Sequence, residues 1–320
     1  MKKVVIIFIL FTIGCAAKIN HPLTKNSDTP HPIPPTTPIP PHPNLSPSFK
    51  FWGGDSTSYC LLKENIIPLD TPESNSDLEK MADELAEKHK LQEAIWLYQL
   101  NPHTLPKAHE LTTRLQKILR QGNFTEIQSS LKGYSPKKVL QFENGIRGIF
   151  KMYADTDHPK TEAAAYKLDQ LLHIGVVPMT VLRKIGDKLG SIQYFMTDVT
   201  EGNGDQAALT RNFRTLKLFD YLTGNPDRRV DNFLIWKTQN YMIAIDNGEV
   251  FNDNTCGDIS EIKLIVQHDP RLMQIIDKLS DASIHSALTK LIQPKFLTKL
   301  IERIHAIQSL ENITPEEIPW

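Results

Sequence analysis

Residues 218–251 read LFDYLTGNPDRRVDNFLIWKTQNYMIAIDNGEVF, and two short apolar runs within this stretch predict a β-hairpin. The runs, residues 233–236 and 241–245, are rich in the aromatic and β-branched side chains that strands favour. The polar triplet 238–240 between them predicts the hairpin loop. This hairpin is the reference point for the rest of the chain, because acids, an amide and glycines gather at its open end.

The predicted loop also sets which residues face each other across the hairpin. Counting back from a three-residue loop places Phe233 opposite Ile245 and Asn232 opposite Asp246. Opposed residues in an antiparallel pair have Cβ atoms about 5 Å apart. A carboxylate and a carboxamide are therefore expected to meet there, with Asp227 on the loop just upstream. Oxygen ligands of this kind suit Mg²⁺ or Mn²⁺.

A simpler interpretation treats the two triplets of this stretch as turns. Asn-Pro-Asp at 225–227 and Asp-Asn-Gly at 246–248 both contain residues that dominate turns for local backbone reasons. Either triplet alone fits that interpretation equally well. Their joint spacing, consistent with one hairpin, favours the metal site.

The segment resembles the catalytic and metal loops of protein-kinase-like phosphotransferases. In that family a catalytic Asp is followed by four residues and a metal-binding Asn, and a second metal-binding Asp opens an Asp-x-Gly triplet. Asp227, Asn232 and Asp246 with Gly248 repeat this spacing. The sequence of this segment is most similar to the atypical branch, which includes phosphatidylinositol kinases, HipA-like kinases and secretory kinases of the four-jointed type. Arg229 is a departure, because several of these families have His there.

A second hairpin is predicted upstream, where Asn144 and Gly145 give a turn signal. Lys151 lies in its second strand on a face shared with apolar residues, so the ammonium must reach water or an acidic partner. Taken alone, Lys151 is equally an exposed strand lysine. In kinases this position carries the Lys that holds the α and β phosphates and pairs with a Glu on the next helix.

The next helix is predicted at residues 161–174, with Gly175 as its stop. Glu162 in the first turn is the expected partner of Lys151. Asp169, two turns further along the helix, is the alternative partner.

Two further strands are predicted at residues 176–183 and 191–199. In kinases such strands lead to the hinge that holds adenine, so the resemblance places the hinge at residues 196–199. Met196 and Asp198 are then the candidate cofactor-binding residues there.

One kinase feature is missing from the sequence, namely a full glycine-rich phosphate loop. Upstream of the second hairpin only Gly133 is present. The atypical branch also lacks that loop, so its absence counts against a typical protein kinase rather than against the whole superfamily. Further along, residues 206–222 have apolar side chains at helical spacing and predict the helix that leads into the catalytic loop.

Composition permits a globular enzyme and argues against a nucleic-acid partner. The chain has 320 residues, of which 40% are hydrophobic and 23% charged, and its net charge is −1. That length suits one two-lobed domain or two small ones. A nucleic-acid surface would need clustered Lys and Arg, and the sequence contains no such cluster.

Residues 1–15 predict a targeting segment, with two lysines, an apolar run too short to span a bilayer comfortably, and a small residue before Cys15. Thr-Ile-Gly-Cys resembles the lipobox of bacterial lipoproteins, although Thr12 stands where Leu is usual. The resemblance implies lipidation of Cys15 and an exported, membrane-anchored lipoprotein in the bacterial periplasm or on the cell surface. A plain secretory signal and a short membrane anchor are the alternatives.

The rest of the N-terminal part divides into a tether and a helical extension. Residues 16–50 are rich in proline and lack hydrophobic periodicity, which predicts a disordered tether. Residues 51–125 predict an extension with two helices. Ser76 with Glu79 forms the capping box of the first, and the second covers residues 106–120.

Residues 126–318 are the predicted kinase-like domain, helical by pattern from residue 258 onward. We therefore expect an α+β, two-lobed, protein-kinase-like fold with a small β-rich N-lobe, a helical C-lobe and the N-terminal extension. Cys60 and Cys256 either form a disulfide in an oxidising compartment or stay as two buried thiols.

The resemblance also implies the residue roles. Lys151 would orient the phosphates of ATP, Asn232 and Asp246 would hold Mg²⁺ or Mn²⁺, and Asp227 would act on the proton of the acceptor hydroxyl. A protein hydroxyl is the preferred acceptor, and a lipid or sugar kinase of the phosphatidylinositol type is the alternative. A nucleotide-binding pseudokinase and a tethered scaffold without nucleotide remain open.

Overall fold

The computed structural model describes residues 74–128, 136–155, 157–202, 210, 212–254, 259–268 and 270–309. All of these lie in one compact unit, Ser48–Trp320. The targeting segment, the tether and all three cysteines fall outside them, so the predicted lipidation and disulfide stay predictions. Within the described ranges no helix combines the length and the apolar character that a membrane span needs.

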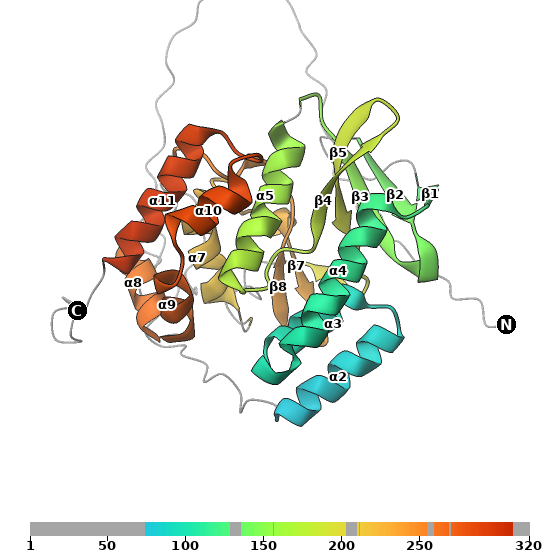
Figure 1. The fold of residues 1–320 in the computed structure, drawn as a ribbon, viewed down its shortest axis with the longest axis horizontal. Coiled ribbons are helices and arrows are strands. Elements are labelled where there is room, and N and C mark those ends of the chain that lie inside the picture. The colour runs from blue at the N-terminus through green and yellow to red at the C-terminus, as the bar shows by residue number, and fades with distance from the viewer. Residues whose placement is uncertain are drawn as a thin grey trace, which may run out of the picture. The chain divides into compact units, whose positions relative to one another are not determined.

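A five-stranded antiparallel sheet with the order β1-β2-β3-β5-β4 forms the smaller lobe (Figure 1). Its strands are β1 (Thr125–Gln128), β2 (Lys137–Gln141), β3 (Arg147–Met152), β4 (Thr180–Ile185) and β5 (Lys188–Tyr194). The predicted turn between β2 and β3 is present as a short 3-10 segment, η3 (Glu143–Gly145). Asn144 and Gly145 have φ angles of 55° and 72° there, a left-handed conformation that these two residue types tolerate best.

Helix α5 (Asp157–Leu172) follows β3 and packs against β4 and β5. It begins four residues before the predicted start and ends two residues before the predicted end. A linker of four residues then joins β5 to β6 (Val199–Glu201), which belongs to a second sheet of order β6-β7-β8. The other two strands are β7 (Phe233–Trp236) and β8 (Tyr241–Ala244).

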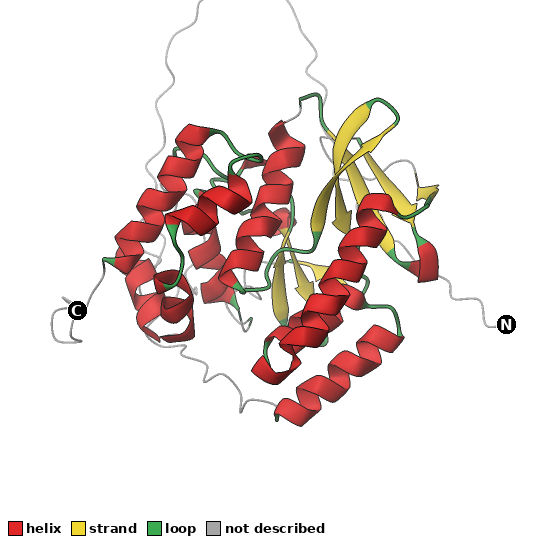
Figure 2. Cartoon of the chain, in the orientation of Figure 1, coloured by secondary structure: helices red, strands yellow, loops and turns green. Residues whose placement is uncertain are grey.

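The larger lobe is helical, as predicted, and lies on the other side of α5 from the five-stranded sheet (Figure 2). Its helices are α7 (Phe213–Thr223), α8 (Ile259–His268), α9 (Pro270–Asp277), α10 (Asp281–Leu288) and α11 (Pro294–Gln308). Pro270 and Pro294 open α9 and α11, where a missing N–H costs little. The α+β, two-lobed architecture expected from the sequence is therefore confirmed.

The described part of the N-terminal extension, from residue 74 onward, contains three helices where two were predicted: α2 (Asn75–Glu87), α3 (Leu91–Gln99) and, after the short η2 (Pro102–Thr104), α4 (Leu105–Gln121). The sequence did not reveal α3 because its residues from Leu91 to Tyr98 are all buried, so the helix has no polar face to give a period. The predicted cap was also wrong. Ser74, not Ser76, caps α2, because its hydroxyl accepts the N–H of Asp77.

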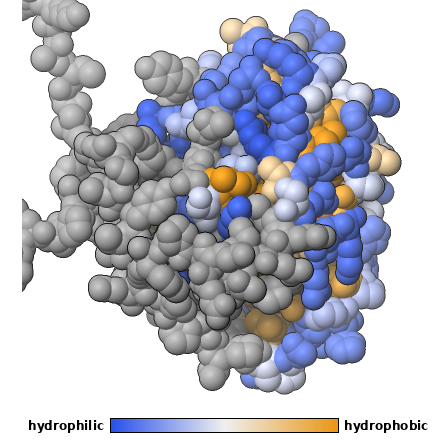
Figure 3. Space-filling view, turned by 90° about the vertical axis from the view of Figure 1, so that its left-hand side faces the viewer, coloured by the Kyte–Doolittle hydropathy of each residue, from blue (hydrophilic) through white to orange (hydrophobic). Residues whose placement is uncertain are grey.

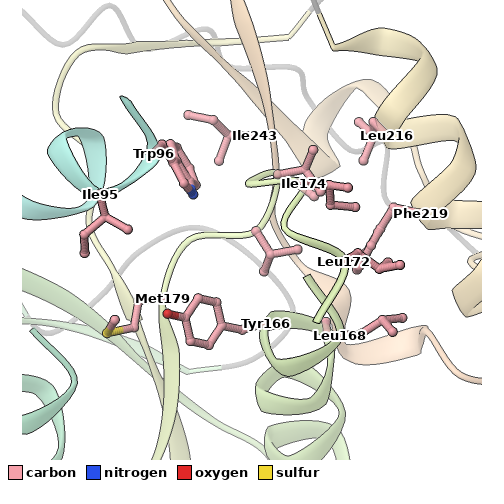
Figure 4. Packing of buried hydrophobic residues seen from close by; sticks show 14 of the residues in the cluster. Ile95, Trp96, Tyr166, Leu168, Leu172, Ile174, Met179, Leu216, Phe219 and Ile243 are labelled. Carbon is pink, nitrogen blue, oxygen red and sulfur yellow. The ribbon is translucent and has the colours of Figure 1, made fainter. Parts of the chain in front are cut away.

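Helix α3 packs against both sheets. The side chain of Gln92 accepts the N–H of Met179 at 2.8 Å, just before β4. The ring of Trp96 lies 6.2 Å from the rings of Trp236 and Tyr241, which belong to β7 and β8. Figure 4 shows Trp96 near Ile243 within the hydrophobic core. The extension is therefore part of the same core as the two lobes.

The predicted register of the hairpin is wrong by one residue. Phe233 pairs with Ala244 and Trp236 pairs with Tyr241, so the turn has four residues, 237–240. In the turn Asn240 has a left-handed φ of 48°, and the N–H of Lys237 donates to the carbonyl of Asp198 beside β6.

Candidate active site

The candidate site begins with Lys151 near the end of β3, whose side chain is 3% exposed. Its Nζ lies 2.6 Å from Oε1 of Glu162 on α5 and 3.0 Å from Oδ1 of Asp246 after β8. The predicted pair of Lys151 with Glu162 is present, and Asp246 joins it. Burial by itself lowers the pKa of Lys151, but the two carboxylates outweigh burial and the pKa is raised. Lys151 therefore stays charged.

The alternative partner, Asp169, is occupied elsewhere. Its Oδ1 accepts the backbone N–H groups of Val176 and Val177 at 2.7 and 3.3 Å. Burial raises the pKa of Asp169 to about 7, and these N–H groups act in the opposite direction. Asp169 thus shapes the chain between α5 and β4 and does not meet Lys151.

Asp246 also contacts a second lysine, which was not among the residues predicted from the sequence. Nζ of Lys137 on β2 lies 3.4 Å from Oδ2 of Asp246, and Lys137 is the direct cross-strand neighbour of Lys151. Burial raises the pKa of Asp246, but the charges of Lys151 and Lys137 outweigh it and lower the pKa to about 2. The carboxylate is therefore an anion between two cations.

The backbone at Asp246 accounts for how it reaches these lysines despite the shifted register. Asn232 lies opposite Ile245, whose N–H donates to the carbonyl of Asn232 at 3.1 Å. Asp246 follows with φ at 54° and ψ at 50°, a left-handed conformation that is uncommon for residues other than glycine. The chain thus changes direction sharply at Asp246, the candidate metal ligand.

The catalytic-loop candidates are in contact with each other. Nδ2 of Asn232 donates to Oδ2 of Asp227 at 2.9 Å and to its carbonyl at 2.6 Å. The N–H of Asp227 donates to Oδ1 of Asn225 at 2.9 Å, and Nε of Arg229 lies 3.2 Å from Oδ1 of Asp227. These contacts hold the carboxylate of Asp227 at the surface of the loop.

Arg228 is a functional candidate that sequence inspection missed. It is buried, and its guanidinium binds Oδ1 of Asp220 at 2.9 Å and Oδ1 of Asn247 at 2.7 Å. It also donates to the carbonyls of Asn232 and Ile245 at 2.5 and 2.9 Å. Arg228 therefore joins the catalytic loop to the chain beside Asp246. No spacing rule relates Asp220 to Arg228, so the sequence offered no signal for this link.

The predicted hinge residues do lie in the linker between the two sheets. Met196 is buried there. Asp198 is engaged by the hairpin turn, because its carboxylate accepts the hydroxyl of Thr238 and its carbonyl accepts the N–H of Lys237. Met196 packs within the hydrophobic core, and Asp198 is partly exposed.

The donor set suits a hard divalent cation shared with a nucleotide. The described residues contain no cluster of three His, Cys, Asp or Glu side chains that would enclose a metal by itself. Mg²⁺ usually takes one or two carboxylates and completes its shell with phosphates and water. Asp246, 37% exposed, and Asn232 match that pattern. One oxygen of Glu162, buried beside Lys151, has no hydrogen-bond partner among the described atoms. This oxygen could therefore accept a further hydrogen bond.

Similarity to known proteins is confined to solved structures. No protein-family model and no curated protein matches the sequence. Solved structures similar to the chain include the three described here. The Golgi casein kinase with Mn and ADP bound has 17% identity and a TM-score of 0.49, over 63% of this chain and 75% of that one. The hydra Fam20 with sugar has 14% identity and a TM-score of 0.46, over 63% of this chain and 89% of that one.

The third is the Helicobacter pylori proinflammatory kinase CtkA, with 14% identity and a TM-score of 0.36 over 60% of this chain and 96% of that one. All three TM-scores are below 0.5. A functional assignment therefore depends on the contacts of Lys151 with Glu162 and Asp246.

Proposed function

We propose that the chain is an ATP-dependent phosphotransferase that uses Mg²⁺ or Mn²⁺ and transfers the γ-phosphoryl group to an alcohol. The observation that carries the proposal is that Lys151 contacts Glu162 and Asp246 at the same time. Active kinases need both the lysine–glutamate pair and the metal-binding Asp in place.

The chain's own residues supply positioning and charge. Lys151 and Lys137 place two ammonium groups beside Asp246, where the phosphates of ATP would lie. Asp246 and Asn232 would hold the cation, which neutralises charge on the phosphoryl oxygens. Asp227 accepts the proton of the acceptor hydroxyl as the new O–P bond forms and the bond to the leaving ADP breaks.

The acceptor and the location are proposed from the sequence. We favour a protein hydroxyl, on the likeness of residues 225–248 to the four-jointed type of secretory kinase. The N-terminal signal supports an exported lipoprotein held to a membrane through Cys15, and the charge balance supports the absence of a nucleic-acid partner. A soluble form without residues 1–50 is suited to assays.

The test combines nucleotide binding with phosphate transfer. Asp227→Asn keeps the shape of the loop and removes the proton acceptor, so transfer from labelled ATP should fall steeply while Mn²⁺-dependent ATP binding survives. Asp246→Ala should weaken that binding, because the cation loses its charged ligand. Asp231→Asn is the matched control, since Asp231 is an exposed neighbour in the same loop and should leave both readouts near wild type.

Each outcome decides between the candidate functions. Binding that depends on Asp246, without transfer to any protein, lipid or sugar, identifies a pseudokinase. No binding of ATP with either metal removes the phosphotransferase and leaves a tethered scaffold. Full transfer activity in both variants refutes the assignment of Asp227 and Asp246 and returns them to the role of turn residues.

A further inference from the structure

His158, in the first turn of α5, connects that helix to the segment that follows Asp246. Its Nδ1 lies 2.7 Å from Oδ2 of Asp155, and its Nε2 lies 2.9 Å from Oε1 of Glu249. Glu249 ends η5 (Asn247–Glu249), which directly follows the candidate metal ligand. The imidazole thus bridges two carboxylates that belong to different parts of the site.

The ring of His158 also packs closely against its surroundings. It stacks on the ring of Tyr153, with centroids 5.0 Å apart and planes 13° from parallel. A Cβ added at Gly248 would lie 3.2 Å from Cδ2 of His158, which is tighter than ordinary contact. This close approach gives a physical reason for glycine in the Asp-Asn-Gly triplet.

These contacts close a ring around the catalytic cluster. The hydroxyl of Tyr153 donates to Oε1 of Glu162 at 3.0 Å, and the same oxygen binds Lys151. Lys151 in turn binds Asp246, and the chain runs from Asp246 through η5 back to the residue that His158 holds. A displacement of η5 at Glu249 would therefore be transmitted to Asp246 from one side and to Glu162 from the other.

We propose that His158 is a positioning residue whose protonated ring clamps η5 to α5 and thereby keeps Asp246 oriented for the metal-bound nucleotide. The inference rests on the proposed function, since it concerns the same site. His158 itself touches neither Asp246 nor Asn232 in the described contacts, and acts through Glu249 and Tyr153.

The clamp depends on charge because a neutral imidazole has one donor and an imidazolium has two. Burial lowers the pKa of His158, but its bonds to Glu249 and Asp155 outweigh burial and raise it. The charged, two-donor form is therefore complete below the ordinary histidine range and is lost as pH rises through the raised pKa.

The two carboxylates respond differently when the proton leaves. Oδ1 of Asp155 also accepts the backbone N–H groups of Asp157 and His158 at 2.9 and 3.0 Å, so the start of α5 holds it at any pH. Within the described part of the chain, the carboxylate of Glu249 is held by the imidazole. The carboxylate of Asp157 contacts Lys160 and Gln293 rather than the ring of His158. We therefore expect Glu249 to be released first.

The experiment measures affinity for ATP with Mn²⁺ between pH 5.5 and 8.5 in wild type, His158→Gln and His158→Arg. The clamp is partly exposed, so its loss should weaken wild-type affinity by about twofold to fivefold at the alkaline end. His158→Gln should start at the weakened value and lack this step. His158→Arg keeps a charge throughout and should hold its acidic-side affinity to higher pH. Titration of the nucleotide phosphates is common to all variants, so it cancels in the ratio of each variant's affinity to the wild-type affinity at the same pH.

His305 provides a matched control. Its Nε2 lies 2.9 Å from Asp281, so it forms an exposed His–Asp pair on α11, away from the site. His305→Gln should reproduce the wild-type pH profile. Glu249→Gln should reproduce the His158→Gln profile, because it removes the other half of the same contact.

The outcomes separate this inference from the proposed function. If wild type binds the metal–nucleotide complex and His158→Gln shows the wild-type pH step, the clamp is refuted and the kinase assignment stands. If wild type binds no nucleotide at any pH, the proposed function fails and the inference fails with it. A step that disappears in His158→Gln and Glu249→Gln, and persists in His305→Gln, supports the clamp.

Discussion

Replacing Arg228 by methionine should destabilise the protein more than any other single change in the catalytic loop. The side chain is 1% exposed and the carboxylate of Asp220, its ion-pair partner, is fully buried. Methionine fills similar volume but leaves Asp220 as a buried charge whose remaining side-chain partner among the described residues is the amide of Asn225. Breaking one side of a buried pair costs about 3–5 kcal/mol, a large share of the roughly 5–15 kcal/mol that a domain has.

Urea unfolding of Arg228→Met beside two companions measures this cost. Arg229→Met is the matched control, because Arg229 is 61% exposed and its pairs with Asp227 and Asp231 are worth at most about 1 kcal/mol. The double variant Arg228→Met with Asp220→Leu removes both charges and should recover at least about 2 kcal/mol of the loss. A loss in Arg228→Met no larger than that in Arg229→Met would refute the claim that this pair organises the loop.

Three further predictions address the core, the glycine and the acid response. Trp96→Ala should cost about 3–5 kcal/mol in urea unfolding, because α3 joins both sheets, and a loss below about 1 kcal/mol would show the extension to be separable. Gly248→Ala should cost about 1 kcal/mol and weaken Mn²⁺-dependent ATP binding, since its Cβ would press on His158, whereas unchanged binding would contradict that contact. The lowered pKa of Asp246 contributes stability that is present above about pH 4 and lost as pH falls towards about 2. The carboxylate is 37% exposed, so we expect only about 1 kcal/mol, measured as the difference in pH slope between wild type and Asp246→Asn.

Figure 3 shows one face of the molecule coloured by hydropathy. Its described part is mainly hydrophilic, with hydrophobic side chains in small patches. The residues in these predictions that bear most on stability, Arg228 and Trp96, are buried. Their effects should therefore appear in unfolding experiments rather than in surface properties.

The sequence by itself determined the features that depend on near neighbours. Asn144 and Gly145 marked a turn because both tolerate left-handed backbone, and the turn is there. The apolar runs of β7 and β8 and the prolines that open α9 and α11 were equally readable, because propensity and period act within a few residues. The spacing of Asp227, Asn232 and Asp246 predicts a common site through its resemblance to kinase loops, and this stays a prediction.

Only the tertiary structure decided the contacts that join distant segments. The register of the hairpin differs from the prediction by one residue, and Lys237 donates to the carbonyl of Asp198 in the distant linker before β6. Glu162 rather than Asp169 met Lys151, because the N–H groups of Val176 and Val177 hold Asp169. Helix α3 was not predicted, because a helix buried on every side has no hydrophobic period. Arg228 with Asp220, and His158 with Glu249, carry no spacing signal, because partners in a hydrogen-bonded network are chosen by position in space and not by separation along the chain.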